Sequence, residues 1–467
     1  MKALVMGLGI HEHGSGLESA RYLAERGAEV TVTDLRDERV LFSSIEELKG
    51  YPIRYVLGKH EIEDFRAADL VVKNPGVRSD SPYLKAARRI ETDISLFLSS
   101  CPARIIAVTG SKGKSSVSSA LYWALNEGRT TGLLRGKVRL GGNITPSPLS
   151  FLDELEETDD VVLELSSWQL GDLSGRELKP RAAIITPIMR DHMDRYDSME
   201  AYVGDKRLIY KNQDGDDVTV AMDDDWGKSF LSESRGRPLV YSDKPLAEGT
   251  SGGWIDKNTG PGYARLWETP MASKIEAGGI VEVVPERPIV PGRHQKQNLL
   301  AASLALLDLG LDAGFIRESL GRFPGIEHRL EFFHESGGIR FYNDSTATIP
   351  EAAAAAITAF EKPPLLVCGG TDKELDFSPL AGAASNARGI ILIAGTGSEK
   401  LKRLLDSGGV KYRGPFDSLE AVLGAVREMA SNGDIVVLSP GCTSFGMFRN
   451  EFDRGQKWKA AVRRAFK

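Results

Sequence analysis

The chain of 467 residues is poor in cysteine: it has three, Cys101, Cys368 and Cys442, far apart in the sequence. An odd number of widely spaced cysteines does not build a disulfide framework and is typical of a reducing compartment. Long apolar runs are also missing, because glycines and then the polar stretch HEHGSG interrupt the opening MKALVMGLGI before it reaches the length of a signal peptide or a membrane span. We therefore expect a cytoplasmic protein without a membrane partner.

A run of basic residues is the third absence. The 59 lysines and arginines are outnumbered by 65 aspartates and glutamates, which gives a formal net charge of −6. A protein that follows a phosphodiester backbone carries a basic stripe, so nucleic acid is not an expected partner. No fixed-period repeat stands out either, and this argues against a solenoid.

The composition that is present is that of a soluble α/β enzyme, with 49 glycines available for tight turns between strands and helices. Short apolar segments that end in small residues alternate with helical stretches. This pattern predicts an α/β fold of three domains: a Rossmann-like domain over residues 1–98, a central P-loop ATPase-type domain with a mostly parallel sheet over 99–326, and a second Rossmann-like domain over 327–467. Residues 81–100 are expected to be helical, and residues 241–291 to form small strands and loops with little chemistry.

The segment GSKGKS, residues 110–115, follows the apolar run RIIAV and leads into small helix-forming residues. In such a loop backbone N–H groups face an anion at a helix N-terminus, Lys114 neutralises phosphate oxygens, and the Ser115 hydroxyl can bind Mg²⁺. ATP is the expected occupant. The strict pattern has another glycine where Val108 stands, so this is a shortened form. The alternative is a glycine turn with an exposed lysine.

Glu164 ends the apolar strand in VVLELSSWQL. A carboxylate at that place is costly unless it is paired, and sharing a Mg²⁺ with Ser115 would explain it. An acid that merely emerges at the solvent end of the strand is the alternative. Further along, His192 stands beside Asp191 and either supplies a metal nitrogen or caps a loop.

A helix is predicted to begin near Ser198, because Asp197 and Glu200 have the spacing of a capping box. Lys206 falls on the apolar stripe of this helix. The other members of the stripe are Met199, Tyr202, Val203, Ile209 and Tyr210. Burial lowers the pKa of a lysine, and CO₂ converts a neutral amine to a carbamate whose oxygens can bind Mg²⁺. The alternative is a lysine stem that lies along apolar surface with its head in water.

Taken in order, several segments of the chain resemble the Mur ligases, and the resemblance spans nearly the whole chain. The segments are TGSKGKSS, ELSSWQL, DHMDRYDSMEAYVGDKRLIYKNQ, HQKQNLLAASLALLDLG, FPGIEHRLEFF, NDSTAT and LSPGCTSFGMFRNEFDRG. They are most similar to the members that add glutamate to UDP-N-acetylmuramoyl-L-alanine. In this family ATP phosphorylates the carboxylate of the UDP-linked substrate, and the incoming amino group attacks the acyl phosphate. The resemblance thus implies a cytoplasmic, monomeric ligase of bacterial peptidoglycan precursor synthesis.

The resemblance also assigns roles to residues. Those expected to bind ATP are Gly110, Ser111, Lys112, Gly113, Lys114, Ser115, Ser116, Asn298, Arg329 and Asp344. Those expected to bind the UDP-sugar are Gly9, Asp34 and Asn143, and those expected to bind the amino acid are Thr348, Lys373 and Ser444. Two Mg²⁺ ions are implied, one held by Ser115 and Glu164, the other by His192 and carbamylated Lys206. The catalytic residues are then Lys114, Glu164, His192 and Lys206.

Three positions near the UDP-sugar and amino-acid sites depart from the family pattern, and Gln295 near the adenine site stands where asparagine is usual. Lysine is usual where Thr346 stands, phenylalanine usually follows the asparagine of the last motif where Glu451 stands, and glycine is common in place of Thr145. Losing a cation and gaining an acid near a site for a dicarboxylic amino acid is electrostatically unfavourable. D-Glutamate is the preferred interpretation, and L-glutamate or another amino acid is the alternative.

Other classes of function fit the sequence less well than a ligase of this kind. A folylpolyglutamate-type ligase would share the P-loop and the lysine, but ELSSWQL and the glycine-rich first domain argue against it. A dehydrogenase is disfavoured because Glu12 replaces the third glycine after Gly7 and Gly9. A catalytically silent ATP-binding regulator would not need Lys206. The histidines of HEHGSG are expected in a solvated loop.

Overall fold

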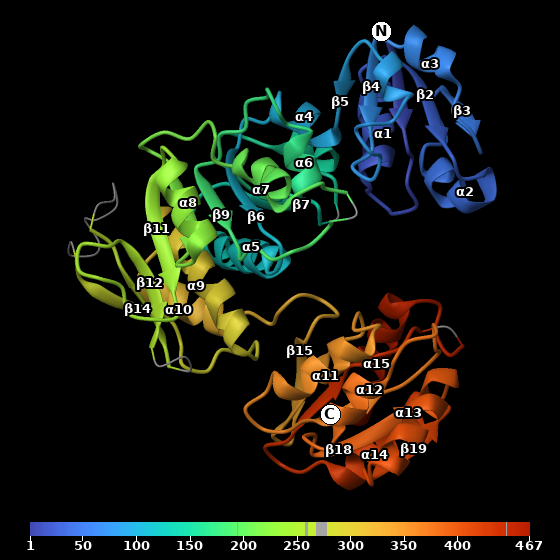
Figure 1. Cartoon of the computed structure of the whole chain (residues 1–467), viewed down its shortest axis with the longest axis vertical. Helices are drawn as coiled ribbons and strands as arrows, with labels where there is room; N and C mark the ends of the chain where they lie inside the picture. Colours follow the sequence, from blue (N-terminus) through green and yellow to red (C-terminus); the bar gives the residue numbers. More distant parts are fainter. Residues whose placement is uncertain (145, 194, 257–259, 268–277, 445) are drawn as a thin grey trace. The chain divides into compact units, whose positions relative to one another are not determined.

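The structure is a computed structural model that describes residues 1–144, 146–193, 195–256, 260–267, 278–444 and 446–467 (Figure 1). The described chain forms two compact units, Met1–Val284 with Gln297–Ser319, and Pro285–Lys296 with Leu320–Lys467. Three mostly parallel sheets lie within these units, so the predicted α/β class is confirmed. The domain limits at 98/99 and 326/327 stay a prediction.

The first sheet is wholly parallel, in the order β3-β2-β1-β4-β5. Its region contains β1 (Lys2–Met6), α1 (Ser15–Glu25), β2 (Glu29–Asp34), α2 (Glu38–Glu47), β3 (Ile53–Leu57), α3 (Ile62–Ala67), β4 (Leu70–Lys73), η1 (Leu84–Ala86), β5 (Ile90–Glu91) and α4 (Asp93–Leu98). The prediction of a helix over residues 81–100 is wrong, because β5 pairs there with β4. Thr92 then starts a new helix through a capping box with Ser95.

The second sheet has the order β14-β13-β12-β11-β10-β9-β6-β8-β7. Its strands are β6 (Arg104–Thr109), β7 (Val138–Gly142), β8 (Asp160–Glu164), β9 (Ala182–Ile185), β10 (Val218–Met222), β11 (Arg237–Ser242), β12 (Gly252–Ile255), β13 (Gly262–Arg265) and β14 (Ile280–Val284). Its helical segments are α5 (Lys114–Thr130), η2 (Pro148–Glu154), α6 (Ser167–Gly171), α7 (Met199–Arg207) and α8 (Asp225–Glu233), followed by α9 (Arg293–Asp308) and α10 (Ala313–Gly321). The short strands β12 to β14 agree with the expectation of small strands over residues 241–291, and they pair as antiparallel neighbours.

The third sheet has the order β15-β16-β20-β17-β18-β19, parallel except for the β15–β16 pair. Its strands are β15 (Glu331–Ser336), β16 (Ile339–Asn343), β17 (Leu365–Cys368), β18 (Gly389–Ile393), β19 (Tyr412–Phe416) and β20 (Ile435–Leu438). Its helices are α11 (Pro350–Thr358), α12 (Ser378–Ala384), α13 (Thr396–Ser407), α14 (Leu419–Met429) and α15 (Glu451–Ala465). Residues of α14 and α15 pack on one face, and residues of α11 to α13 pack on the other.

The central strands are apolar and buried along their length, and then give way to small or polar residues at their carboxyl ends. Strand β6 leads into the loop at Gly110, and β8 ends at Glu164. Because these neighbours are parallel, their carboxyl ends share one edge of the sheet, where ligands of open α/β sheets bind. The parallel pairing of β6 and β8 therefore brings the loop at Gly110 and the side chain of Glu164 to the same edge of the sheet.

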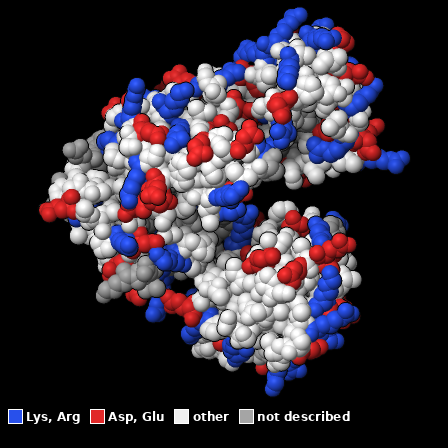
Figure 2. Space-filling view, viewed as in Figure 1, with Lys and Arg blue, Asp and Glu red and all other residues white. Residues whose placement is uncertain are grey.

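The face of the molecule drawn in Figure 2 shows no single dominant charge. On the face drawn in Figure 2, Lys and Arg side chains are interspersed with Asp and Glu. Among the described residues, no helix combines the length and the apolar composition needed to cross a bilayer.

Candidate active site

Two glycines shape the backbone of the loop between β6 and α5. Gly110 has φ +140° and Gly113 has φ +92°, in the region that side chains rarely adopt. A Cβ at Gly110 would lie 1.9 Å from Thr186 Oγ1, and a Cβ at Gly113 would lie 2.5 Å from Asn298 Oδ1. The loop backbone therefore runs against Asn298 of α9, with its amides ahead of a helix N-terminus. This arrangement suits a phosphate group.

Two lysines converge on this loop. The Nζ atom of Lys114 donates to the carbonyl oxygens of Gly110 and Ser111, both at 3.1 Å, and Nζ of Lys206 donates to the same Gly110 oxygen at 2.9 Å. Lys206 is 2% exposed, so the predicted burial is confirmed. Burial, and after it the nearby charge of Lys114, lowers the pKa of Lys206 to about 7. A large part of the Lys206 amine is therefore neutral near physiological pH.

Helix α7 presents Lys206 from its last turn. The helix starts at the predicted place, but the predicted cap at Asp197 is wrong. Ser198 has the extended backbone of an N-cap, and its Oγ accepts a hydrogen bond from the N–H of Ala201 at 3.1 Å. The stripe opposite solvent includes the fully buried Tyr202, whose ring lies 4.5 Å from the Lys206 Nζ. The burial of Lys206 decides between the two alternatives left open by the helical periodicity, since its head does not lie in water.

Glu164 lies at the end of β8, level with Val108 of β6. The side chain is buried, and its Oε1 accepts a hydrogen bond from Asn143 Nδ2 at 2.8 Å. Its Oε2 atom is buried without a hydrogen-bond partner among the described residues. A carboxylate oxygen in that state is costly. It fits a site in which a cation such as Mg²⁺ takes the place of the missing donor.

A metal at this edge would need ligands beyond carboxylates. Within the described ranges, no group of three or more His, Cys, Asp or Glu side chains is placed to hold a metal ion. Mg²⁺ is bound in many proteins through one or two carboxylates with phosphate oxygens and water. The donor set of Ser115, Glu164 and a phosphate fits that chemistry.

The ring of His192 contacts the aromatic ring of Trp168. His192 has a left-handed backbone, φ +56°, and its ring meets the ring of Trp168 edge-on at 4.7 Å. The guanidinium of Arg195 lies 4.7 Å from the Trp168 ring and donates to the Gly76 carbonyl oxygen at 3.1 Å. Trp168 is thus in contact with both residues.

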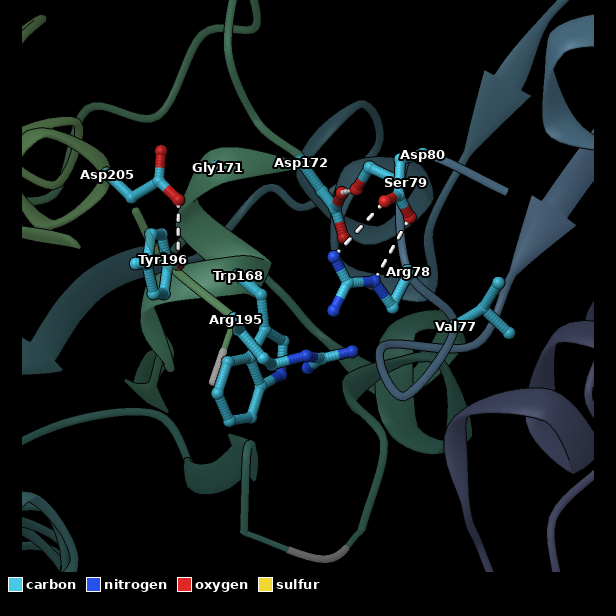
Figure 3. A pocket seen from close by; sticks show the side chains of 10 residues that line it. All are labelled: Val77, Arg78, Ser79, Asp80, Trp168, Gly171, Asp172, Arg195, Tyr196 and Asp205. Atoms are coloured by element: carbon cyan, nitrogen blue, oxygen red, sulfur yellow. Dashed lines mark hydrogen bonds and ion pairs between the residues drawn. The ribbon is translucent and has the colours of Figure 1, made fainter. Parts of the chain in front are cut away.

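Trp168 and Arg195 also line a cavity of about 400 Å³ (Figure 3). The other lining residues are Val77, Arg78, Ser79, Asp80, Gly171, Asp172, Tyr196 and Asp205. Sequence reasoning did not single out Trp168 or Arg195. The sequence signal for them is their place in the motifs ELSSWQL and DHMDRY, which also carry Glu164 and His192. No periodicity marks Arg195, because it lies in an irregular loop.

The remaining residues of the loop lie close by. Ser111 Oγ is hydrogen-bonded to Tyr202 OH at 2.8 Å, so it ties the loop to α7. Lys112 is exposed, and its Nζ pairs with Asp191 Oδ2 at 3.2 Å. Ser115 and Ser116 lie in the first turn of α5 and are half-buried.

The glycine loop of the first sheet is organised by Asp34. Its Oδ2 accepts a hydrogen bond from the Leu8 N–H at 2.9 Å, and its two oxygens also accept from Arg36. Burial acts to raise the pKa of Asp34, but the hydrogen bonds from Arg36 outweigh it and the pKa is lowered. The carbonyl oxygen of Gly9 accepts from Ser44 Oγ at 2.8 Å. The histidines of HEHGSG are exposed, as expected.

The second unit carries the residues predicted to bind the amino acid, each on a different loop. Thr348 follows β16, Lys373 follows β17 and Ser444 follows β20, and these strands are neighbours in the sheet. Lys373 is exposed, and Ser444 is buried. The loops therefore meet at one edge of the sheet.

Asp344 and Arg329 differ strongly in exposure. Arg329 is exposed, whereas Asp344 is buried and accepts hydrogen bonds from Ser439 Oγ at 2.6 Å and Leu330 N–H at 3.1 Å. Burial raises the pKa of Asp344 to about 7. The buried carboxyl group is therefore close to titration at neutral pH.

The structure gives local reasons for two of the three departures, while Thr145 lies outside the described residues. Thr346 Oγ1 donates to the His328 carbonyl oxygen at 2.8 Å. Asn450 caps α15 by accepting from the Asp453 N–H, and Glu451 lies in the first helical turn. An acid at a helix N-terminus is stabilised by the helix dipole. Both residues therefore have a structural function.

Models of protein families match the chain in three successive stretches. They are the Mur ligase MurD-like N-terminal domain over residues 1–95, the Mur ligase middle domain over 108–306, and the Mur ligase glutamate ligase domain over 328–442. Together they account for most of the chain.

Curated relatives match over nearly the full length. One from Roseiflexus sp. (strain RS-1) is 40% identical, with 99% of this chain and 98% of the relative covered. One from Treponema pallidum (strain Nichols) is 38% identical, with 99% and 97% covered. Both are named UDP-N-acetylmuramoylalanine--D-glutamate ligase.

Solved structures share the fold at low sequence identity. UDP-N-acetylmuramate-alanine ligase MurC from Thermotoga maritima aligns with a TM-score of 0.56 at 19% identity over 100% of both chains. MurF ligase from Thermotoga maritima, in complex with ADP, aligns with a TM-score of 0.51 at 16% identity, covering 93% of this chain and 95% of MurF.

Proposed function

Because this chain belongs to the Mur ligase family and is an ATP-dependent ligase, we propose that it joins D-glutamate to UDP-N-acetylmuramoyl-L-alanine. Both substrates are proposed on the basis of the names of the relatives that match over nearly the full length. The reaction would take place in the cytoplasm, as a step of peptidoglycan precursor synthesis, on a monomeric enzyme.

One structural observation supports the phosphoryl-transfer part of this proposal. Two lysines meet at the Gly110 carbonyl oxygen, and no described residue donates a hydrogen bond to the Glu164 Oε2 atom at the same edge of the sheet. Lysines and a metal-binding carboxylate are the groups that phosphoryl transfer requires. That MurF ligase was solved with ADP supports nucleotide binding by this fold.

The residues of this chain have distinct tasks in the proposed reaction. The amides of residues 110–113 and the Lys114 ammonium bind and orient the phosphates of ATP, with Asn298, Arg329 and Asp344 at the rest of the nucleotide. Ser115 and Glu164 would hold one Mg²⁺ ion, and His192 with a carbamate on Lys206 would hold a second; such ions would supply neutralisation of charge on the phosphoryl oxygens. The unpartnered oxygen of Glu164 and the lowered pKa of Lys206 make both assignments chemically reasonable.

The bond changes in the proposed reaction balance. A carboxylate oxygen of the UDP-linked substrate attacks the γ-phosphorus, and ADP leaves. The amino nitrogen of glutamate then attacks the acyl carbon and loses a proton, and inorganic phosphate leaves. Gly9, Asp34 and Asn143 hold the UDP-sugar in this scheme. Thr348, Lys373 and Ser444 hold the glutamate.

The proposal is tested by ATP-dependent phosphate release with UDP-N-acetylmuramoyl-L-alanine and D-glutamate, L-glutamate or no amino acid, with product masses recorded. We expect turnover and a glutamyl adduct with D-glutamate. An adduct with L-glutamate alone would overturn the stereochemical choice, and no adduct with either would overturn glutamate as the substrate. If L-glutamate were used with a folate acceptor instead, the folylpolyglutamate-type alternative would replace the proposal.

A further inference from the structure

Helix α15 carries one arginine inside the protein. Arg454 is 1% exposed, and it precedes the buried residues Trp458, Ala461 and Val462 at helical spacing. The next residue, Gly455, allows a close approach: a Cβ there would lie 2.1 Å from His328 Nδ1. The helix is thus packed tightly at the point where the guanidinium enters the core.

The guanidinium of Arg454 binds two loops at once. Its Nε donates to Ser345 Oγ at 3.0 Å, its Nη2 donates to the Ser345 carbonyl oxygen at 2.8 Å, and its Nη1 donates to the Cys442 carbonyl oxygen at 3.1 Å. Within the described part of the chain, no carboxylate forms an ion pair with Arg454. An arginine buried in this way, with its charge directed only at hydroxyl and carbonyl oxygens, is uncommon.

A third loop lies against the same group. A Cβ at Gly370 would be 3.8 Å from Arg454 Nη1. The Thr371 and Thr443 backbones are hydrogen-bonded to each other in both directions at 3.1 Å, which joins the loop after β17 to the loop after β20. Arg454 therefore lies where the loops that follow β16, β17 and β20 meet.

These are the same three loops that carry the residues expected to bind the amino acid. Thr348 is three residues after Ser345, Lys373 is three after Gly370, and Ser444 is two after Cys442. Loops at the carboxyl ends of neighbouring parallel strands form the usual binding edge of such sheets. An error in the spacing of the loops would therefore separate the binding groups from one another.

We propose that Arg454 is a positioning residue of the amino-acid site: it holds the loops after β16 and β20 directly, and the loop after β17 through the Thr371–Thr443 backbone bonds, at the spacing needed to bind the substrate's carboxylates. The inference rests on the proposed function for the identity of the amino acid. Arginine suits the task because its planar fork reaches several acceptors in fixed directions, whereas a lysine ammonium is a single point on a flexible stem. Its positive charge also favours a dicarboxylic substrate across the loops.

The test compares steady-state kinetics of the full chain with Arg454→Lys and Arg454→Met. The matched control is Arg464→Met, because Arg464 is an exposed arginine on the same helix. We expect Arg454→Lys to raise KM for glutamate about tenfold or more, because small errors of placement are costly in a binding site. KM for ATP should rise less than KM for glutamate, because the P-loop residues are untouched and only Asp344, beside Ser345, is both an expected nucleotide residue and part of a loop that Arg454 contacts. Arg464→Met should match the wild type.

A purely structural role would lower the melting temperature of Arg454→Lys without changing KM for glutamate in the folded fraction, and that result would overturn the inference. Because loss of the guanidinium in Arg454→Met can unfold the second unit, Ser345→Ala supplies an independent variant: it removes the Oγ acceptor and should raise KM for glutamate in the same direction. An unchanged KM in a folded Ser345→Ala would also count against the inference. A wild-type enzyme that uses no glutamate would instead overturn the proposed function, and this inference with it.

Discussion

Each of the two compact units holds a buried basic side chain on a helix beside the carboxyl ends of a parallel sheet. The two side chains differ in the number of oxygens to which they donate hydrogen bonds. Lys206 of α7 donates to one carbonyl oxygen and faces a second lysine, and its pKa is lowered to about 7. Arg454 of α15 donates to three oxygens, and burial lowers its pKa only to about 10. The lowered pKa leaves a large part of the Lys206 amine neutral near pH 7, whereas the Arg454 guanidinium stays charged.

The comparison shows that burial alone does not decide what a cation does. A lysine with one acceptor and a like charge nearby loses its proton easily, and the neutral amine can then react with CO₂. A guanidinium with several acceptors keeps its charge, so it can fix backbone segments in place. We therefore expect that substitutions which preserve charge have different consequences at the two positions.

The largest effect is expected from Lys206→Arg. The variant keeps a cation but cannot form a carbamate, so we expect kcat to fall by about 10²–10³-fold, the scale of losing one charge-stabilising group in a transition state. Lys211→Ala, an exposed lysine beyond the same helix, is the control. Steady-state phosphate release measures both. If Lys206→Arg retained full kcat, the carbamate would have no role and the contrast with Arg454 would fail.

The carbamate itself can be observed. In ¹³C-bicarbonate, wild-type protein should give a carbamate carbon signal that is strong at pH 8 and weak at pH 6, because the amine is protonated below its pKa of about 7. Lys206→Arg should lack the signal. A signal of equal strength at both pH values would contradict the account of the neutral amine.

An intermediate effect is expected from Glu164→Gln. The amide keeps the shape of the side chain but removes the charge that the unpartnered oxygen offers to a cation. We expect the Mg²⁺ concentration needed for half-maximal activity to rise by about 10–100-fold, as for other weakened metal sites. A Mg²⁺ titration of the rate measures this change. An unaltered Mg²⁺ requirement would mean that Glu164 is not a ligand.

A further effect concerns stability in the second unit rather than activity. Burial raises the pKa of Asp344 to about 7 from an ordinary value of 3.8. The folded state therefore binds the proton more tightly, so the stability that this provides is complete below the ordinary pKa of 3.8 and is lost as pH rises from there to about 7. Asp344→Asn cannot ionise, so at pH 8 it should be more stable than the wild type, by on the order of 2–4 kcal/mol.

At pH 4 the Asp344→Asn variant and the wild type should have nearly equal stability. Hydrogen exchange of β16, residues 339–343, reports on the unit that holds Asp344 and avoids mixing in the unfolding of the first unit. Equal protection of the two proteins at pH 8 would show that the carboxyl group titrates at its ordinary pKa.

Much of this arrangement follows from local sequence patterns. Helical periodicity places Lys206 on the apolar stripe of α7, and the alternation of strands and helices predicts the α/β class. The same periodicity marks Arg454, since Trp458, Ala461 and Val462 continue its face of α15. An arginine on an apolar stripe can equally lay its stem along the surface and keep its head in water, so the pattern alone does not predict what the guanidinium binds.

Other features depend on contacts between distant segments and could not be predicted from one sequence. The contacts of Arg195 and His192 with the Trp168 ring join an irregular loop to α6. The meeting of Ser345 and Cys442 at one guanidinium depends on the strand order β16-β20-β17, which the sequence order conceals. Strand β5 escapes prediction because its two residues are too few to show a period.

The measurement that tests the central claim most directly uses UDP-N-acetylmuramoyl-L-alanine labelled with ¹⁸O in its terminal carboxylate. If this chain activates that carboxylate as an acyl phosphate, one labelled oxygen passes into the inorganic phosphate released in the presence of ATP and D-glutamate. Mass spectrometry of the phosphate should therefore show the label in step with the glutamyl product. Unlabelled phosphate accompanied by glutamyl product would contradict the account.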